Sequence, residues 1–378
     1  MAKNKITDKR ILILTERLKQ GFGVDLVVHE QAKRLALRHQ VAIMAVEVDW
    51  EIFKDTPYAI YQIPIPLFFN PIKQDWAAYK MLREFKGQLE MFEIFIIQTP
   101  TFNTWLPFLT TRGKVILNFY GNSPSTGYRG LKQYRKQIFD TLEHSWYFRY
   151  PQAMVTISKF LQQTLPLYAK RKCQIIPLGY NHVTEAAQAF NPLQKTNILR
   201  QYFIDARDKL VVYVGRLSYH ENPYKNTYDL IKLRRSLNHH GLAKVKILAI
   251  GLPQGEIEAE FYQEGVMVAP HVPISDLAVL MEVATVCFSP SLWEGFNLPL
   301  LESQALGVPV VAYDLGAHRE MVLPNQTGYL PANFDQAQKQ IRNLITDTNL
   351  RNKMGLAAQT WSHGFSWGKN VKQIEALL

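Results

Sequence analysis

Short apolar runs alternate along the chain with longer segments in which apolar residues recur every three or four positions. The runs Ile11–Leu14 and Val41–Val46 are wholly apolar, and apolar residues between Val24 and Leu35 recur at helical spacing. Parallel strands buried on both faces have such continuous runs, and they need a crossover helix between them. The pattern therefore predicts a strand, a glycine-bearing loop, a helix and a second, parallel strand.

The same alternation predicts a second set of elements after a break. The pattern lapses over Ala186–Phe203, which we interpret as the connection between two domains. The predicted strands are Ile94–Gln98, Val115–Phe119, Ala153–Ile157 and Cys173–Pro177 before it, and Leu210–Val214, Lys246–Ile250, Val266–Ala269, Thr285–Ser289 and Val308–Tyr313 after it. Helices are expected near Thr227–Asn238, Asp276–Ala284 and Leu298–Leu306. The predicted fold class is α/β, with two Rossmann-like, doubly wound parallel-sheet domains facing each other across a cleft.

Composition agrees with a globular enzyme and excludes several other classes. The chain has 378 residues, of which 47% are hydrophobic and 20% charged, so disordered and collagen-like proteins are excluded. Cys173 and Cys287 are the only cysteines, too few for a disulfide framework or a thiol metal site. The N-terminus lacks the features of a secretory signal. We therefore expect a cytoplasmic protein.

Charge is distributed unevenly between the two predicted domains. Residues 1–190 contain 25 Lys and Arg against 15 Asp and Glu, whereas residues 191–378 contain 18 against 17. Within 112–172 there are 11 basic residues and two acidic ones, interleaved with aromatic residues. This segment is compatible with a solvated face above an aromatic core, an anionic membrane surface or a nucleic acid.

The stretch 289–314, SPSLWEGFNLPLLESQALGVPVVAYD, carries the clearest chemistry. It predicts a strand end, a loop, and a helix that has Pro299 in its first turn and ends at Gly307. The N–H groups of Asn297 and Leu298 would lie at the positive end of this helix, which suits a phosphate. Glu294 and Glu302 stand eight positions apart around this turn. Since a carboxylate accepts two hydrogen bonds from a vicinal diol, the pair could hold sugar hydroxyls on either side of a phosphate.

These residues resemble the paired-glutamate motif of glycosyltransferase family 4, whose members are retaining nucleotide-sugar enzymes of the GT-B fold. Further segments are similar to that family: Gly21–Val24, Ser158–Phe160 with Ile176–Gly179, Val214–Leu217 with Lys225–Asn226, Gly316–Glu320 with Thr327–Gly328, and Phe365–Trp367. The resemblance implies an acceptor domain over 1–190 and a donor domain over 191–354. It also implies a helix at about 355–378 that packs back on the first domain.

The resemblance also implies a role for particular residues. Glu294 would contact the donor sugar, Glu302 the ribose, and Arg216 with Lys225 the diphosphate; Glu294, Arg216 and Lys225 are the expected catalytic set. Further expected donor-binding residues are Gly295, Phe296, Asn297, Leu298, Gly23, Gly215, His271 and Val272, and those on the acceptor and sugar side are Tyr120 and Gly121. Because the sequence has no D-x-D motif, we expect neither a metal nor another cofactor.

Two departures from the family pattern affect this transfer of roles. The interval from Arg216 to Lys225 contains the insertion Tyr219–Asn222, so the reach of Lys225 depends on geometry. Tyr120 stands where many members have a histidine near the donor sugar, and a tyrosine there could still donate a hydrogen bond.

The resemblance thus implies a retaining, metal-independent hexosyltransferase that uses a nucleotide-sugar donor. The preferred acceptor is a membrane glycolipid or another lipid-linked acceptor, reached from the cytoplasmic face of a membrane with 112–172 on its anionic surface. A soluble enzyme for a small sugar or polysaccharide is the alternative, and a catalytically silent nucleotide-sugar-binding protein is a third. A nucleic-acid partner is not expected, because it would have no use for the donor site.

Overall fold

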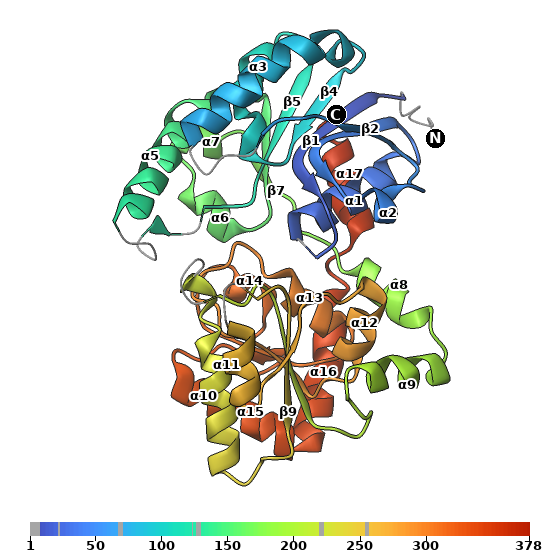
Figure 1. Ribbon diagram of the computed structural model, residues 1–378, viewed down its shortest axis with the longest axis vertical. Coiled ribbons are helices and arrows are strands. Elements are labelled where there is room, and N and C mark those ends of the chain that lie inside the picture. The colour runs from blue at the N-terminus through green and yellow to red at the C-terminus, as the bar shows by residue number, and fades with distance from the viewer. Residues whose placement is uncertain are drawn as a thin grey trace. The chain divides into compact units, whose positions relative to one another are not determined.

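The computed structural model describes residues 8–21, 23–66, 71–122, 124–125, 130–218, 223–253 and 257–378, which form two compact units (Figure 1). The first unit consists of 1–122, 134–179 and 367–378, and the second of 123–133 and 180–366. The chain thus leaves the first unit after Gly179, whereas the sequence placed the boundary at 190. Only 367–378 return to the first unit, not the whole of the expected 355–378.

The first unit is built on a seven-stranded sheet in which all paired strands are parallel, in the order β3-β2-β1-β4-β5-β6-β7. Its strands are β1 (Arg10–Leu18), β2 (Gln40–Val48), β3 (Ala59–Gln62), β4 (Ile94–Ile97), β5 (Lys114–Phe119), β6 (Ala153–Thr156) and β7 (Cys173–Ile175). The central residues Ile11–Thr15 of β1 and all of β4 are buried, as expected for a sheet covered on both faces.

The helices of the first unit connect these strands. They are α1 (Gly23–Leu35), α2 (Trp50–Phe53), α3 (Pro71–Leu89), η1 (Pro100–Trp105), α4 (Leu106–Leu109), α5 (Leu131–Ser145), η3 (Tyr147–Arg149), α6 (Lys159–Thr164), α7 (Leu167–Lys170) and, from the other end of the chain, α17 (Trp367–Glu375). Helix α17, red in Figure 1, lies against the blue helix α1. Val371, Ile374 and Leu377 complete the same core as Ile11 and Val28.

The second unit has a six-stranded sheet, again with parallel pairs, in the order β10-β9-β8-β11-β12-β13. Its strands are β8 (Leu210–Val214), β9 (Lys246–Ile250), β10 (Met267–Ala269), β11 (Val286–Ser289), β12 (Val310–Ala312) and β13 (Gly328–Tyr329). Its helices are α8 (Asn181–Gln188), α9 (Pro192–Gln201), η4 (Pro223–Lys225), α10 (Tyr228–His239), α11 (Ile257–Gln263), α12 (Ile274–Glu282), α13 (Leu298–Ala305), α14 (His318–Met321), α15 (Phe334–Thr346) and α16 (Thr348–Ser362).

In each sheet, successive strands are added on one side of the first strand and then on its other side. This change falls between β1 and β4 in the first sheet and between β8 and β11 in the second. Open α/β sheets bind ligands outside the carboxyl ends of their strands at such a switch point. The loops after β8 and β11 are therefore the first place to look for a site in the second unit. The predicted strands and the α/β class with two Rossmann-like units are confirmed.

The interpretation of Ala186–Phe203 as an interdomain connection is wrong. This stretch holds the end of α8 and all of α9, and both helices pack on α12 within the second unit (Figure 1). The start of α9 is a capping box: Asn191 and Gln194 bond each other's main-chain N–H groups, with Pro192 in the first turn. The residues of this capping box can be recognised in the sequence. The polar composition of the segment, however, favoured the interpretation as a connection.

Candidate functional site

The loops that follow β8 and β11 meet through an ion pair. The Nζ of Lys225 donates to Oε1 of Glu294 over 2.6 Å, and their side chains are only 15% and 13% exposed. The main chain reinforces this contact, because Leu292 N donates to Tyr224 O over 2.6 Å. Two residues 69 positions apart in the sequence are thus joined at the carboxyl edge of the sheet, at its switch point.

The carboxyl group of Glu294 is ionised despite its burial. Burial alone raises the pKa of Glu294, but the nearby charge and hydrogen bond of Lys225 hold it below its usual value of 4.5. An ionised carboxylate only accepts hydrogen bonds, so Glu294 is suited to bind hydroxyl groups.

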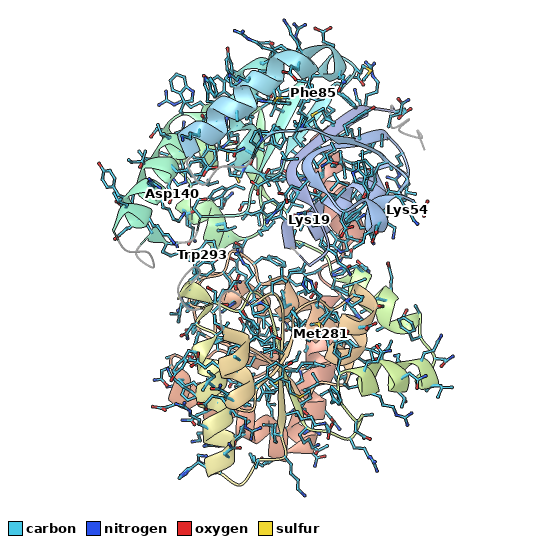
Figure 2. The ribbon with its side chains drawn as sticks, in the orientation of Figure 1. Lys19, Lys54, Phe85, Asp140, Met281 and Trp293 are labelled. Carbon is cyan, nitrogen blue, oxygen red and sulfur yellow. The ribbon has the colours of Figure 1, made fainter. Side chains whose placement is uncertain are left out.

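Arg216 lies close to this pair. Its Nη2 donates to the Tyr224 hydroxyl over 2.9 Å, and the Tyr224 ring packs edge-on against Trp293, the residue before Glu294 and labelled in Figure 2. Arg216 itself is exposed, so its guanidinium remains accessible to an anionic ligand. The insertion Tyr219–Asn222 between the two cations lies outside the described residues.

Gly215 lets the chain turn sharply between β8 and Arg216. Its φ is +154°, and a Cβ at this position would come within 2.7 Å of the Tyr213 hydroxyl. That hydroxyl donates to the carbonyl oxygen of Arg216 over 3.0 Å, which fixes the turn from the other side. A side chain at 215 would therefore disturb the position of Arg216.

A buried histidine of the Gly316–Glu320 segment holds the turn before α13. Asn297 has a left-handed conformation, with φ of +70°, and its Nδ2 lies 2.8 Å from both Ser289 Oγ and His318 Nε2. The other ring nitrogen of His318 lies 2.8 Å from Tyr313 O. Since a carbonyl only accepts, Nδ1 carries the hydrogen and Nε2 receives the Asn297 amide. Burial lowers the pKa of His318, which keeps the ring neutral.

Glu302 lies one turn into α13 and is buried, with 4% of its side chain exposed. Its Oε1 lies 2.8 Å from His182 Nε2, a residue of α8 that is equally buried. Pro299 in the first turn and Gly307 after the last turn, with φ of +77°, bound α13 as expected. The sequence indicated Glu302 but gave no sign of His182.

The other expected donor-binding residues occupy different environments. Gly295 and Leu298 are buried beside the turn, and Phe296 packs edge-on against Phe365 in the core. His271 is exposed and Val272 is half-buried, just after the carboxyl end of β10. The main chain at 271–272 is therefore placed where a ligand at this sheet edge could reach it.

The remaining expected residues, Gly23, Tyr120 and Gly121, belong to the first unit. Gly23 opens α1 after the loop that follows β1, and Phe22 of this loop lies outside the described residues. Asp25 closes the loop by accepting from Lys19 N over 2.9 Å, while burial raises the pKa of Asp25 to about 6. Tyr120 and Gly121 directly follow β5 at the carboxyl edge of its sheet.

A continuous line of hydrogen bonds fixes the Tyr120 hydroxyl. The hydroxyl donates to Gln98 Oε1, Gln98 Nε2 donates to Gln31 Oε1 over 3.0 Å, and Gln31 Nε2 donates to Asn370 Oδ1 over 3.1 Å. The line ends where Asn370 Nδ2 donates to Pro177 O over 2.8 Å. Because that carbonyl can only accept, the direction of every bond is set, and the Tyr120 proton is committed to Gln98.

Several cations of the basic segment 112–172 serve the fold. Lys172 Nζ donates to the carbonyl oxygens of Arg149 and Pro151, and Lys136 pairs with Asp140, which Figure 2 labels on α5. Tyr128 and Arg129 of this segment lie outside the described residues. Only part of the positive charge is thus left for a partner.

Metal clusters and membrane-spanning helices are both absent from the part of the chain that the structure describes. These residues contain no group of three or more His, Cys, Asp or Glu side chains that could hold a metal ion. Among the same residues, no helix is both long enough and apolar enough to cross a membrane.

Comparison with known proteins finds a family similar to most of the second unit. Residues 194–361 match the family described as Glycosyl transferases group 1, a span that includes Arg216, Lys225, Glu294 and Glu302. This part of the chain is thus similar to the domains of that family. D-inositol 3-phosphate glycosyltransferase of Corynebacterium efficiens is 27% identical over 191 residues, 47% of this chain and 44% of that protein. The match thus spans less than half the length of that curated relative.

Solved structures extend the similarity in fold to both units. Sucrose-phosphate synthase from Thermosynechococcus elongatus has a TM-score of 0.78 at 17% identity and covers 98% of each chain. Anabaena HepE in complex with UDP-glucose has a TM-score of 0.76 at 18% identity, covering 97% of this chain and 98% of that one. The chain therefore has the fold of these two structures, which is the GT-B fold predicted from the sequence.

Proposed function

We propose that this protein is a retaining, metal-independent glycosyltransferase that moves a hexose from a nucleotide-sugar to a hydroxyl group of a membrane glycolipid. The observation that carries the proposal is the contact of Lys225 with Glu294 beside Arg216, at the switch point of the second sheet. This puts two cations and one hydroxyl-binding carboxylate where an open α/β sheet binds its ligand. The similarity to HepE, solved with UDP-glucose, supports a nucleotide-sugar as that ligand.

Each group has a role in the transfer. The bond from the anomeric carbon to the β-phosphate oxygen breaks, and its electron pair leaves with the nucleoside diphosphate. Arg216 and Lys225 stabilise the negative charge that develops there, so they favour the transition state over the ground state. The acceptor oxygen bonds to the anomeric carbon on the face that the phosphate leaves, and the phosphate takes the acceptor's proton.

Glu294 and Glu302 orient the donor in this proposal. Glu294, ionised and joined to Lys225, accepts hydrogen bonds from the sugar hydroxyls. Glu302 accepts from the ribose. The turn at Asn297, held by His318, presents the main chain at the positive end of α13 to the diphosphate.

The lipid acceptor is supported by the surface of α5. Three large apolar residues at helical spacing, Tyr134, Ile138 and Leu142, are 64%, 43% and 47% exposed on this helix. Arg135 stands among them. Monomeric globular proteins rarely leave such a stripe open to water, and Lys or Arg beside it adds attraction to anionic headgroups.

A hollow of about 380 Å³ is lined by residues of α3 and of the segment after α5. Trp76 and Tyr79 of α3 line it together with Trp146 and Tyr147 after α5. Tryptophan and tyrosine rings favour the headgroup region of a bilayer, because one end is apolar and the other polar. The exposed rings are thus compatible with a membrane surface as the partner of this unit.

Transfer from radiolabelled nucleotide-sugars to a lipid extract tests the proposal. We expect labelled glycolipid from one donor, and a turnover at least roughly tenfold lower in Glu294→Ala and in Arg216→Ala, equal to about 1.4 kcal/mol of transition-state stabilisation. The controls are Glu264→Ala and Arg235→Ala, which break an ion pair of the same kind on the surface of the same unit. Binding without transfer or hydrolysis for every donor would instead indicate a silent binder.

A further inference from the structure

The contact between His182 and Glu302 joins a carboxylate of the proposed donor site to the helix at which the chain enters the second unit. His182 Nε2 lies 2.8 Å from Glu302 Oε1, and 4% of each side chain is exposed. His182 is three residues beyond Gly179, where the first unit ends. A buried contact between residues 120 positions apart requires both helices to hold a fixed relation.

Small apolar residues provide that fixed relation. Val183 and Ala187 of α8 are buried against Ala278 of α12, with Leu306 at the end of α13 packed alongside. Because side chains this small have few rotamers, the packing leaves α8 little freedom to rotate. The imidazole of His182 is therefore held toward α13.

The chemistry of the pair determines which group donates. An ionised carboxylate can only accept, so Nε2 of His182 carries the hydrogen and donates it to Oε1. A glutamate side chain in a helix otherwise has several rotamers, and a charge-assisted hydrogen bond selects one of them. With Oε1 held in this way, the position of Oε2 is also set.

We propose that His182 is a positioning residue of the donor site, which orients the Glu302 carboxylate for the ribose hydroxyls of the nucleotide. This inference rests on the proposed function, since it takes Glu302 as the ribose-binding residue. Its consequence is that affinity for the ribonucleotide depends on a side chain outside the glycosyltransferase group 1 match, which begins at residue 194. Because His182 acts on binding of the donor, its substitution should raise KM for the donor and change kcat little.

Two substitutions separate positioning from a general structural role. In His182→Gln the side-chain amide nitrogen falls at the same distance along the chain as Nε2 of histidine, so it keeps the bond to Glu302. In His182→Asn the amide nitrogen falls where Nδ1 of histidine lies. The asparagine side chain is therefore too short for this nitrogen to reach Glu302. Gln188→Ala, at the exposed end of the same helix, is the control.

Calorimetric titration with UDP, GDP and ADP, and with their 2′-deoxy forms, is the test. For the nucleotide that the wild-type protein binds best, we expect His182→Asn to weaken binding roughly tenfold and to lose most of the preference for the ribose form. His182→Gln and Gln188→Ala should stay within about threefold of wild type and keep that preference. His182→Ala in a Glu302→Ala background should have no further effect.

The outcomes distinguish this inference from the proposed function. If wild type binds a nucleotide but His182→Asn binds it equally well and with the same ribose preference, the inference is wrong and the donor site stands. Equal losses in His182→Gln and His182→Asn would also overturn it, because they would indicate a need for the imidazole shape. If wild type binds none of the nucleoside diphosphates, the proposed function fails as well.

Discussion

At the scale of single residues, several groups of this protein have their protons and charges fixed by neighbours that the sequence does not indicate. Tyr120 is an example. From the sequence alone a tyrosine here could donate a hydrogen bond to a sugar, but its hydroxyl proton is already donated to Gln98. Tyr120 therefore offers a substrate its ring and an acceptor oxygen, but no hydroxyl proton.

This interpretation predicts different effects for two substitutions of Tyr120. Tyr120→Phe keeps the ring, so we expect kcat/KM within about threefold of wild type, whereas Tyr120→Ala should lower it by at least about tenfold through loss of ring contacts. Steady-state kinetics with the donor found in the transfer assay provides the measurement. Equal damage from both substitutions would indicate that the hydroxyl contacts the substrate.

Glu143 on α5 predicts a pH dependence of stability. It accepts hydrogen bonds from Asn122 and Asn103 inside the first unit, but burial outweighs them and raises its pKa from 4.5 to about 7. The folded protein thus holds this proton more tightly than the unfolded chain does. The contribution of Glu143 is most favourable below about pH 4.5 and is lost as pH rises through about 7.

We therefore expect Glu143→Gln to be more stable than wild type at pH 8, and the difference to shrink toward pH 5. The upper limit is about 3.5 kcal/mol, from roughly 1.4 kcal/mol for each pH unit of the shift. The Asn103 Oδ1 has no hydrogen-bond partner among the described residues, so a turned Asn103 amide can accept from the new side chain. Urea unfolding at both pH values measures the difference, and a constant difference would contradict the prediction.

At the scale of elements, the main question is which partner binds the exposed apolar residues of α5, namely Tyr134, Ile138 and Leu142. The double substitution Tyr134→Glu, Ile138→Glu places two charges on its exposed apolar stripe. We expect wild-type protein to sediment with anionic vesicles at low salt and the double variant to remain in the supernatant, because it loses apolar area and gains repulsion. Leu356→Glu, at a position 68% exposed on α16 of the second unit, is the control. Wild-type protein that does not sediment would remove the membrane surface from the proposal.

The strands also show how much of the fold could be predicted from the sequence. Buried strands such as β1 and β11 were predicted well, because a short apolar run bounded by polar residues is typical of a strand covered on both faces. Strand β13 has only two residues and β3 is half-exposed, so neither has such a run. The residues of the site differ in the same way. Glu294, Lys225 and His318 stand in segments that resemble family motifs, whereas His182 acts through a contact between distant segments and has no local pattern.

At the scale of the whole molecule, the two units should respond to different changes. Ile374→Ala removes a side chain that is 1% exposed in the core of the first unit, which should cost about 2–5 kcal/mol there. We expect two calorimetric transitions, with only the first unit's lowered by this change and only the second unit's raised by a nucleoside diphosphate. Leu356→Ala, on an exposed position, is the control. A single transition that shifts in both cases would show that the units unfold together.

The return of residues 367–378 to the first unit has a consequence for biosynthesis. A ribosome delivers the seven strands of that unit early, but α17 emerges only after the whole second unit has been made. The unit translated first is thus the last to complete its interior, while the second unit has all its own segments by residue 366. A nascent chain must keep part of the first interior uncovered throughout that interval, which is a period of exposure to aggregation and to chaperone binding.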